Sequence, residues 1–177
     1  IIICPNDVVQ HWVKNINEIY ENIPNTEIII KPDARCDIES PIIHRKKIYE
    51  EKYEAGKNKY IVINWDTIQQ KQLKIDMINF LKQKIDFVIL DEIHFSKISH
   101  EKNISERRKN LTAFLKYSRK KNRKLKTLGL SATPVVNNLT EGKSLIQLLS
   151  NLDFQDQDTR ATIPNAVLLH EKILNMS

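Results

Sequence analysis

Glycine is scarce in this 177-residue chain, which contains only Gly56, Gly129 and Gly142. A loop that cradles nucleotide phosphates needs glycines before a Gly-Lys-Ser/Thr ending, because backbone amides must approach the anion and the lysine must reach its outer phosphates. Residues 142–144 read Gly-Lys-Ser, but they lie inside a predicted helix and lack the preceding glycine and strand. We interpret this match as a coincidence and find no phosphate-binding loop of this kind in the sequence.

Cysteine and long apolar runs are also scarce. Cys4 and Cys36 are too few for a metal cluster, and the histidines show no zinc-like spacing with them, so we expect both thiols to be reduced and structural. No apolar run approaches the roughly 20 residues that a membrane-spanning helix needs, and the apolar opening lacks the basic flank of a signal peptide. These features predict a cytoplasmic protein without a membrane partner.

Chain length and net charge restrict the domain organisation and the possible partners only weakly. The chain has the length of one domain, and no stretch of it resembles a linker, a repeat or a low-complexity tract. Its 28 Lys and Arg against 22 Asp and Glu give a net charge of +6. This charge suits a polyanionic partner but is also common in lysine-rich soluble proteins, so charge alone does not decide the partner.

Apolar, strand-like segments alternate with helical patterns along the chain. The segments are nearly continuous rather than polar at every second residue, which is typical of parallel strands shielded on both faces by crossover helices. We therefore predict an α/β fold, with a mostly parallel sheet between two helical layers. The predicted strands cover residues 1–4, 26–31, 60–64, 86–90 and 126–131, and the predicted helices cover about 8–22, 41–55, 66–81, 111–117, 139–150 and a last segment that Thr162 and Pro164 start.

An acidic pair, Asp91 and Glu92, directly follows the predicted strand at 86–90, and His94 comes two residues later. In parallel sheets, ligands gather beyond the C-terminal strand ends, where this pair is expected. Magnesium-nucleotide chemistry uses two such carboxylates, because one holds the cation and the next orients or deprotonates an attacking water. Both residues are therefore candidate magnesium ligands and catalytic groups. The alternative is that they only cap the following segment.

A second junction follows the strand at 126–131, where Ser131, Ala132, Thr133 and Pro134 lead into the predicted helix at 139–150. A group that senses hydrolysis must lie at a neighbouring strand end, so that its hydroxyl reaches the acidic pair and the histidine. We predict this role for Ser131 and Thr133. Taken alone, the segment could also be a proline-marked turn between a strand and a helix.

Together, the two junctions resemble the Asp-Glu-x-His and Ser-Ala-Thr boxes in the first motor lobe of superfamily-two helicases and translocases. The similarity is closest to SWI/SNF-type ATPases, whose acid box continues to a lysine and whose later box continues through two asparagines and a glutamate. The corresponding residues here are Lys97, Asn137, Asn138 and Glu141. Ile93 replaces the family's usual alanine, and Ala132 replaces the glycine of eukaryotic remodellers, which looks more like prokaryotic or viral members.

The resemblance implies a RecA-like lobe with ATP and magnesium as cofactors. It implies that Asp91, Glu92 and His94 are catalytic, and that Asp91, Ser131 and Thr133 bind the nucleotide. It also implies that Asp91 and Glu92 hold the magnesium ion.

The resemblance covers almost the whole chain and implies contacts with double-stranded DNA. Two edges of the lobe would hold the phosphate backbone of one strand, which a motor needs because such contacts do not depend on base sequence. The residues assigned to this contact are Pro5, Gln10, Asn64, Thr67 and Lys97. Trp12 and Trp65 border the same edges. Trp12 also lies in the apolar stripe of its helix, which favours a core position, whereas Trp65 could be either a core residue or a DNA contact.

The basic run at 116–126 has two interpretations. It could be a phosphate-facing patch with Tyr117 interleaved, or a solvated helix end that the helix dipole favours. The Glu-Arg-Arg-Lys segment at 106–109 has the same two interpretations.

In the family, the phosphate-binding loop directly precedes the segment similar to residues 1–5. The resemblance therefore implies that residues 1–177 are part of a first RecA-like lobe, incomplete without the phosphate-loop strand and without the second motor lobe of the same chain. We expect this piece alone to be inactive. We also expect it to self-associate through the sheet edge beside the Ser131 strand, which the missing strand would cover.

Three functions are compatible with the sequence. The first is part of the ATP-binding lobe of a SWI/SNF-like ATPase that couples ATP hydrolysis to movement on duplex DNA. The second is a helicase-like subunit of a restriction or phage-defence system, which shares the same boxes. The third is a non-catalytic, degenerate lobe that binds nucleic acid without hydrolysis.

Overall fold

The computed structural model of the chain describes residues 1–20, 26–30, 58–69, 84–98, 104–133, 138–154 and 158–175. The predicted helix at 41–55 and most of the one at 66–81 lie outside these stretches, as does Cys36.

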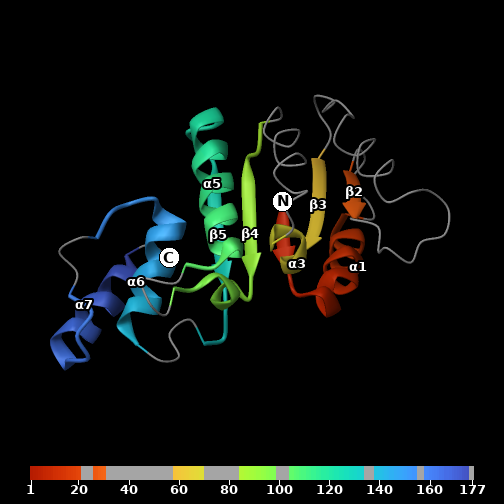
Figure 1. The fold of residues 1–177 in the computed structure, drawn as a ribbon. Helices are drawn as coiled ribbons and strands as arrows, with labels where there is room; N and C mark the ends of the chain where they lie inside the picture. Colours follow the sequence, from red (N-terminus) through yellow and green to blue (C-terminus); the bar gives the residue numbers. More distant parts are fainter. Residues whose placement is uncertain are drawn as a thin grey trace.

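The described strands form one parallel sheet in the order β2-β3-β1-β4-β5 (Figure 1). This confirms the prediction of an α/β fold with a mostly parallel sheet. Because parallel strands end at the same edge of a sheet, the segments that follow β1, β3, β4 and β5 emerge together. The strand bounds are β1 (Ile2–Cys4), β2 (Thr26–Ile30), β3 (Asn58–Asn64), β4 (Phe87–Asp91) and β5 (Lys126–Leu130).

Helices connect and cover these strands, and several begin at a side-chain acceptor. Ser105, Asn138 and Thr162 each accept a hydrogen bond from the backbone N–H three residues later, which satisfies one of the donors that a helix start leaves without a partner. The helical bounds are η1 (Asn6–Val8), α1 (Val9–Tyr20), α3 (Trp65–Gln69), η2 (Ile93–Ser96), α5 (Glu106–Lys121), α6 (Leu139–Ser150) and α7 (Ile163–Leu174).

Two helix starts differ from the sequence prediction. Helix α3 begins at Trp65, directly at the end of β3, because the Asn64 side chain caps it by accepting from the Thr67 N–H at 3.0 Å. Helix α5 begins at Glu106 rather than near residue 111, because the Ser105 side chain caps a first turn that is charged instead of apolar.

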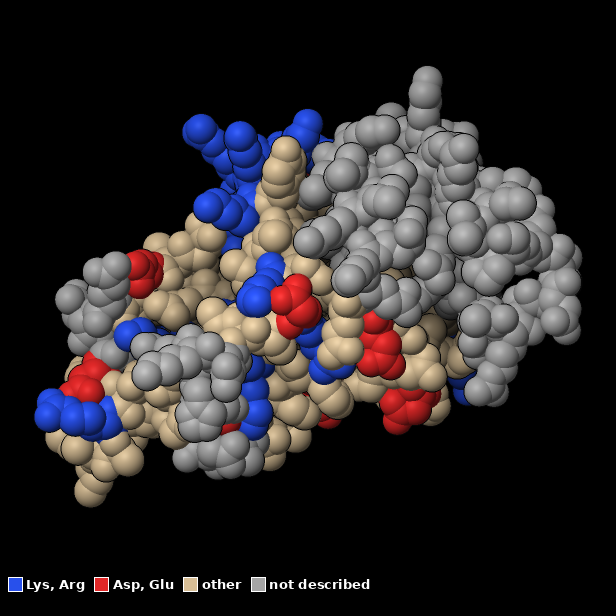
Figure 2. All heavy atoms as spheres, in the orientation of Figure 1, with Lys and Arg blue, Asp and Glu red and all other residues tan. Residues whose placement is uncertain are grey.

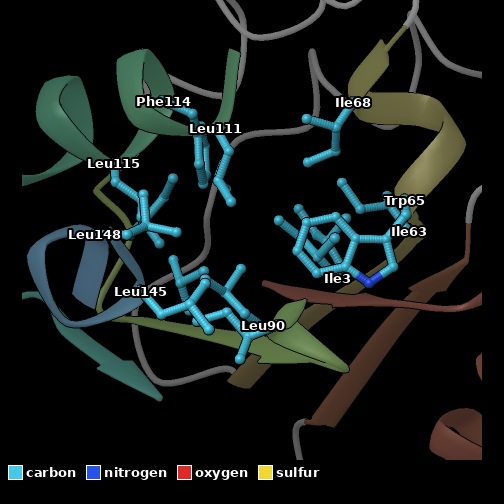
Figure 3. Packing of buried hydrophobic residues seen from close by; sticks show 14 residues of the cluster. Ile3, Ile63, Trp65, Ile68, Leu90, Leu111, Phe114, Leu115, Leu145 and Leu148 are labelled. Atoms are coloured by element: carbon cyan, nitrogen blue, oxygen red, sulfur yellow. The ribbon is translucent and has the colours of Figure 1, made fainter. Parts of the chain in front are cut away.

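The larger core lies between one face of the sheet and helices α3, α5 and α6 (Figure 3). Apolar side chains of alternate strand residues meet the apolar stripes of these helices there. The buried members are Ile3, Ile61, Ile63, Trp65, Ile68, Ile85, Val88, Leu90, Ile93, Leu111, Phe114, Leu115, Leu145 and Leu148.

A smaller core lies on the opposite face of the sheet, under α1. Ile2, Cys4 and Val62 pack there against Ile16, while their strand neighbours, such as Ile3, point into the larger core. Because successive strand side chains alternate between faces, this division shows helices on both sides of the sheet. The chain therefore has the three layers that the sequence predicted.

Gly129 in β5 permits a close approach of two segments. A Cβ atom at this position would lie 2.7 Å from Ile93 Cδ1 and 3.0 Å from Leu149 Cδ1. Such a contact is shorter than a methyl group tolerates, so the absence of a side chain lets η2 and α6 pack directly on β5. The segment after β4 is thereby held against the neighbouring strand.

Within the described stretches, no helix has the length and apolar character needed to cross a membrane.

Cys4 is a buried core residue whose thiol has little access to solvent. Its Sγ lies 3.8 Å from the carbonyl oxygen of Ile63, and burial, reinforced by the nearby charges of Asp91 and Asp7, raises its pKa to about 12. The thiolate is the reactive form of cysteine, so a raised pKa and burial together suppress reactivity at neutral pH.

We therefore predict that Cys4 does not react with a thiol reagent in the folded chain. In a Cys36→Ser variant, where Cys4 is the one remaining thiol, Ellman's reagent at pH 8 should release almost no thionitrobenzoate until guanidinium is added. Full release from the folded variant within minutes would contradict the buried position of Cys4.

Candidate functional site

The acid box lies where β4 leaves the sheet. Asp91 is the last residue of β4, and Glu92 follows in the left-handed region, with φ 53° and ψ 53°. This conformation costs an L-residue about 1–2 kcal/mol. Burial of Ile93, which is 3% exposed, offsets that cost by drawing η2 back onto the core. The sharp turn leaves Asp91 and Glu92 half-buried at the rim of the sheet.

Glu92, His94 and Ser131 meet at this rim. His94 Nδ1 lies 3.1 Å from Glu92 Oε2 and 3.1 Å from Ser131 Oγ. The Ser131 hydroxyl also donates to Glu92 Oε2 at 3.5 Å. The contact follows from strand pairing, because β4 and β5 are neighbours and Asp91 is in register with Leu130. The two junctions therefore lie at the same end of the sheet, as the sequence predicted.

Thr133 lies beside this cluster in a different way. Its backbone N–H donates to Ser131 Oγ at 3.2 Å, while the residue itself is exposed. The backbone of Thr133 thus orients the Ser131 hydroxyl. The contact of Thr133 with nucleotide stays a prediction. Pro134 and Asn137 lie outside the described residues, whereas Asn138 caps α6.

Asp91 is held by both tryptophans of the chain. The Trp12 indole N–H donates to Asp91 Oδ2 at 2.8 Å, and the Trp65 indole N–H donates to the Asp91 carbonyl oxygen, also at 2.8 Å. Trp65 is 3% exposed and belongs to the larger core, which answers the question that the sequence left open for it.

The donors at the rim fit magnesium better than a transition metal. No group of three or more His, Cys, Asp or Glu side chains within the described stretches is arranged to hold a metal ion. Magnesium needs no such cage, since one or two carboxylates with substrate phosphates and waters commonly bind it. Asp91 fits this role because, among the contacts of the described residues, its carboxylate accepts a hydrogen bond at Oδ2 and none at Oδ1.

The residues predicted to contact nucleic acid divide into exposed and internal positions. Gln10 is exposed and Pro5 is half-buried. Asn64 bridges two strand ends, since its Nδ2 donates to Asn6 Oδ1 at 2.8 Å, and its Oδ1 accepts the Thr67 hydroxyl at 2.6 Å. Thr67 is only 3% exposed. In this conformation Thr67 therefore supports the turn, because its hydroxyl is used internally.

Lys97 also has an internal partner rather than the surface position expected of a phosphate contact. Its Nζ lies 3.2 Å from Glu141 Oε2, and the Glu141 side chain is fully buried while that of Lys97 is 23% exposed. This ion pair joins the segment after the acid box to α6. A phosphate at Lys97 would have to compete with it.

Arg108 is the internal residue that sequence reasoning missed. It donates to the carbonyl oxygens of Ser96 and Ser144, at 3.1 and 2.6 Å, so it joins α5, η2 and α6. Burial lowers its pKa to about 10, which leaves it charged at neutral pH. Its position three residues before Leu111 and seven before Leu115, on the apolar stripe of α5, was the signal for a buried side chain.

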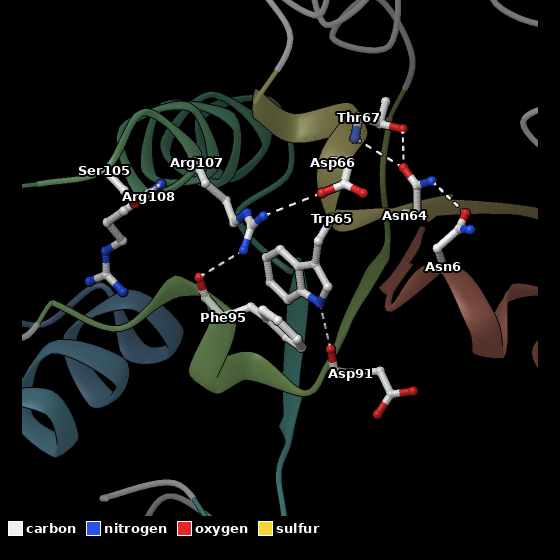
Figure 4. A network of polar contacts seen from close by, with 10 residues as sticks. All are labelled: Asn6, Asn64, Trp65, Asp66, Thr67, Asp91, Phe95, Ser105, Arg107 and Arg108. Atoms are coloured by element: carbon white, nitrogen blue, oxygen red, sulfur yellow. Dashed lines mark hydrogen bonds and ion pairs between the residues drawn. The ribbon is translucent and has the colours of Figure 1, made fainter. Parts of the chain in front are cut away.

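A second arginine connects the acid box to the turn after β3 (Figure 4). Arg107 donates to the Phe95 carbonyl oxygen and to Asp66 Oδ1, both at 3.4 Å, and its guanidinium lies over the Phe95 ring at 5.5 Å from the centroid. The Phe95 ring in turn stacks on His94 with centroids 4.8 Å apart. Contacts therefore run without a gap from the catalytic histidine candidate to α3.

The basic run at 116–126 lies at the opposite end of the sheet from the acid box. Lys126 is in register with Phe87, at the start of β4, whereas Asp91 ends that strand. Figure 2 shows Lys and Arg side chains gathered over this far end of α5. Arg119 donates to the Leu148 and Leu149 carbonyl oxygens at the end of α6, at 3.0 and 2.6 Å. The arrangement favours the solvated helix end over a phosphate patch at the acid-box rim.

A protein-family model described as the SNF2-related domain matches residues 1–165. The curated proteins contain no match to the chain.

The Lys97–Glu141 ion pair generates a stability prediction. Lys97→Met should lower the free energy of unfolding by about 3 kcal/mol, because it removes a cation that pairs with a fully buried carboxylate. Lys109→Met is the matched control, since it breaks an exposed ion pair with Glu106 and should cost less than about 1 kcal/mol. Urea unfolding of the three chains measures both values. Equal stability of Lys97→Met and the wild type would contradict the stabilising role of this ion pair.

Proposed function

The chain belongs to the SNF2-related domain family, and on this premise we propose that it forms part of the first ATP-binding lobe of a DNA-dependent ATPase that moves along duplex DNA. The observation that carries the proposal is the meeting of Glu92, His94 and Ser131 at the C-terminal rim of a parallel sheet. Ligands of such sheets bind at this rim. In the family at large, this lobe belongs to a nucleic-acid motor.

The rim residues divide the chemistry of hydrolysis among them. Magnesium-bound ATP would supply the phosphoryl group, and Asp91 with Glu92 are the residues that would hold the ion. The Glu92 carboxylate is the candidate base that orients and deprotonates the attacking water. Its contacts with His94 and Ser131 fix the direction of the carboxylate, since Oε2 is the oxygen that both of them approach.

The contacts of Ser131 support a role for its hydroxyl in sensing the state of that carboxylate. Its hydroxyl lies within reach of both Glu92 and His94, and its Oγ accepts the Thr133 N–H. A change of charge or position at Glu92 would therefore alter the turn that leads from β5 to α6. This is how the acid box and the segment after β5 would communicate in the motor.

The candidate DNA contacts lie at the same rim of the sheet. Pro5 follows β1 and Asn64 ends β3, while β1 pairs directly with β4. Backbone contacts from this rim would let the motor track one strand without reading its bases. The intact Glu92 favours this function over a degenerate lobe that binds nucleic acid without hydrolysis.

Glu92→Gln should strongly reduce ATP turnover in the complete gene product that carries this lobe. Loss of the base should lower duplex-stimulated turnover by a factor of about 10² to 10⁴, without loss of folding. Glu18→Gln, at an exposed carboxylate on α1, is the control and should hydrolyse ATP like the wild type. Phosphate release with and without duplex DNA measures the effect. Turnover that Glu92→Gln leaves unchanged would remove Glu92 from the mechanism.

The 177-residue chain alone should hydrolyse ATP at no measurable rate. Its sequence contains no glycine-rich phosphate loop, and the second lobe of such motors supplies further groups to the nucleotide. Phosphate release from the purified chain, with the complete gene product as the positive control, tests this expectation. If the purified chain hydrolyses ATP and Glu92→Gln abolishes that activity, the expectation is wrong.

A further inference from the structure

We infer that Trp12 is a positioning residue for Asp91, which it holds by one carboxylate oxygen so that the other is kept for the cation. The inference rests on the proposed function, because it assigns a role to Trp12 at the same magnesium site. The observation behind it is the 2.8 Å hydrogen bond from the Trp12 indole N–H to Asp91 Oδ2, between residues 79 positions apart.

The path of α1 explains how Trp12 reaches the acid box. Val8, Val9 and Val13 pack with Trp12 onto the smaller core, and Ile89 of β4 also packs against this core. Trp12 is thereby anchored on the face of the sheet that α1 covers, at the edge toward which β4 runs. An indole that is largely removed from water needs an acceptor for its N–H, and Asp91 provides it.

Trp65 completes the arrangement from the other face. It belongs to the larger core and donates to the Asp91 backbone carbonyl oxygen at 2.8 Å. One tryptophan thus holds the main chain of Asp91 and the other holds its side chain, from opposite faces of the sheet. The chain contains only these two tryptophans. Because both indole N–H groups of the chain donate to Asp91, this aspartate is held in one orientation.

The chemistry of the two groups explains why such a hold matters for a metal ligand. An indole N–H can only donate, so it competes with no cation for the site, and an ionised carboxylate accepts at either oxygen. Fixing Oδ2 leaves Oδ1 as the oxygen for the ion and prevents the carboxylate from rotating freely. Residues that orient a metal ligand in this way commonly contribute about 10- to 100-fold to metal affinity.

The test uses the 177-residue chain and Mn²⁺ as the probe for the magnesium site. Trp12→Phe keeps an aromatic ring in the smaller core but removes the donor, and we expect it to weaken Mn²⁺ binding about 10-fold by electron paramagnetic resonance. Its thermal unfolding midpoint should stay close to that of the wild type. Ile19→Ala, at an exposed position on the same helix, is the control and should bind Mn²⁺ like the wild type.

A second measurement tests the contact without any metal. The two indole N–H signals in a ¹H–¹⁵N spectrum are assigned by their loss in Trp12→Phe and Trp65→Phe. Asp91→Asn should shift the Trp12 signal, because the acceptor loses its charge, whereas Glu18→Gln should not. If Asp91→Asn leaves the chemical shift of the Trp12 indole N–H unchanged, the inference is wrong.

The outcomes separate the inference from the function on which it rests. Mn²⁺ binding that Asp91→Asn abolishes but Trp12→Phe leaves unchanged overturns the inference and keeps the metal site. Binding that Asp91→Asn does not affect overturns the metal assignment of the proposed function, and the positioning role of Trp12 falls with it. Loss of binding in both variants, with the indole shift present, supports both.

Discussion

The parallel pairing of β4 with β5 is the constraint on which the rest of the structure depends. It places Asp91 in register with Leu130, so the two polar segments that follow these strands emerge side by side. If the register of β4 slipped by one residue, every side chain of that strand would move to the other face of the sheet, and Glu92 would be separated from Ser131. Gly129 helps to maintain the arrangement, because its lack of a side chain admits Ile93 and Leu149 against β5.

Buried polar groups hold the segment after the acid box in place. Arg108 and the Lys97–Glu141 pair join η2 to α6, and Ser144 Oγ accepts the Ile98 N–H at 3.1 Å. Such groups contribute little net stability compared with apolar packing, but removing one partner leaves a buried charge poorly compensated. Their effect is therefore to specify one position of η2 relative to α6, the helix that follows the Ser131 turn.

Intermediate side chains connect the acid box to the turn after β3, where two of the candidate DNA residues lie. Trp65 joins α3 to the Asp91 main chain, and Arg107 joins Asp66 to Phe95, whose ring lies on His94. Asn64 and Asn6 connect the ends of β3 and β1. A movement at the acid box would thus be felt at the turn after β3 through packed side chains. The large basic run takes no part in this, because it lies at the other end of the sheet.

Local pattern determined much of this protein. Continuous apolar runs identified the five strands and their parallel arrangement, and the acidic pair and the Ser-Ala-Thr segment at strand ends identified the rim where they meet. Those inferences needed only the period of the side chains and the rule that parallel strands end together.

The tertiary structure alone decided which polar side chains face the site and which support it. Trp12 with Asp91, Arg108 with Ser144 and Lys97 with Glu141 are partners separated by 79, 36 and 44 positions. No local spacing encodes these contacts, because they depend on the order of the strands and on which helix covers which face. Thr67 likewise looks like an exposed phosphate ligand in sequence, and only the packing of α3 against the core turns its hydroxyl inward.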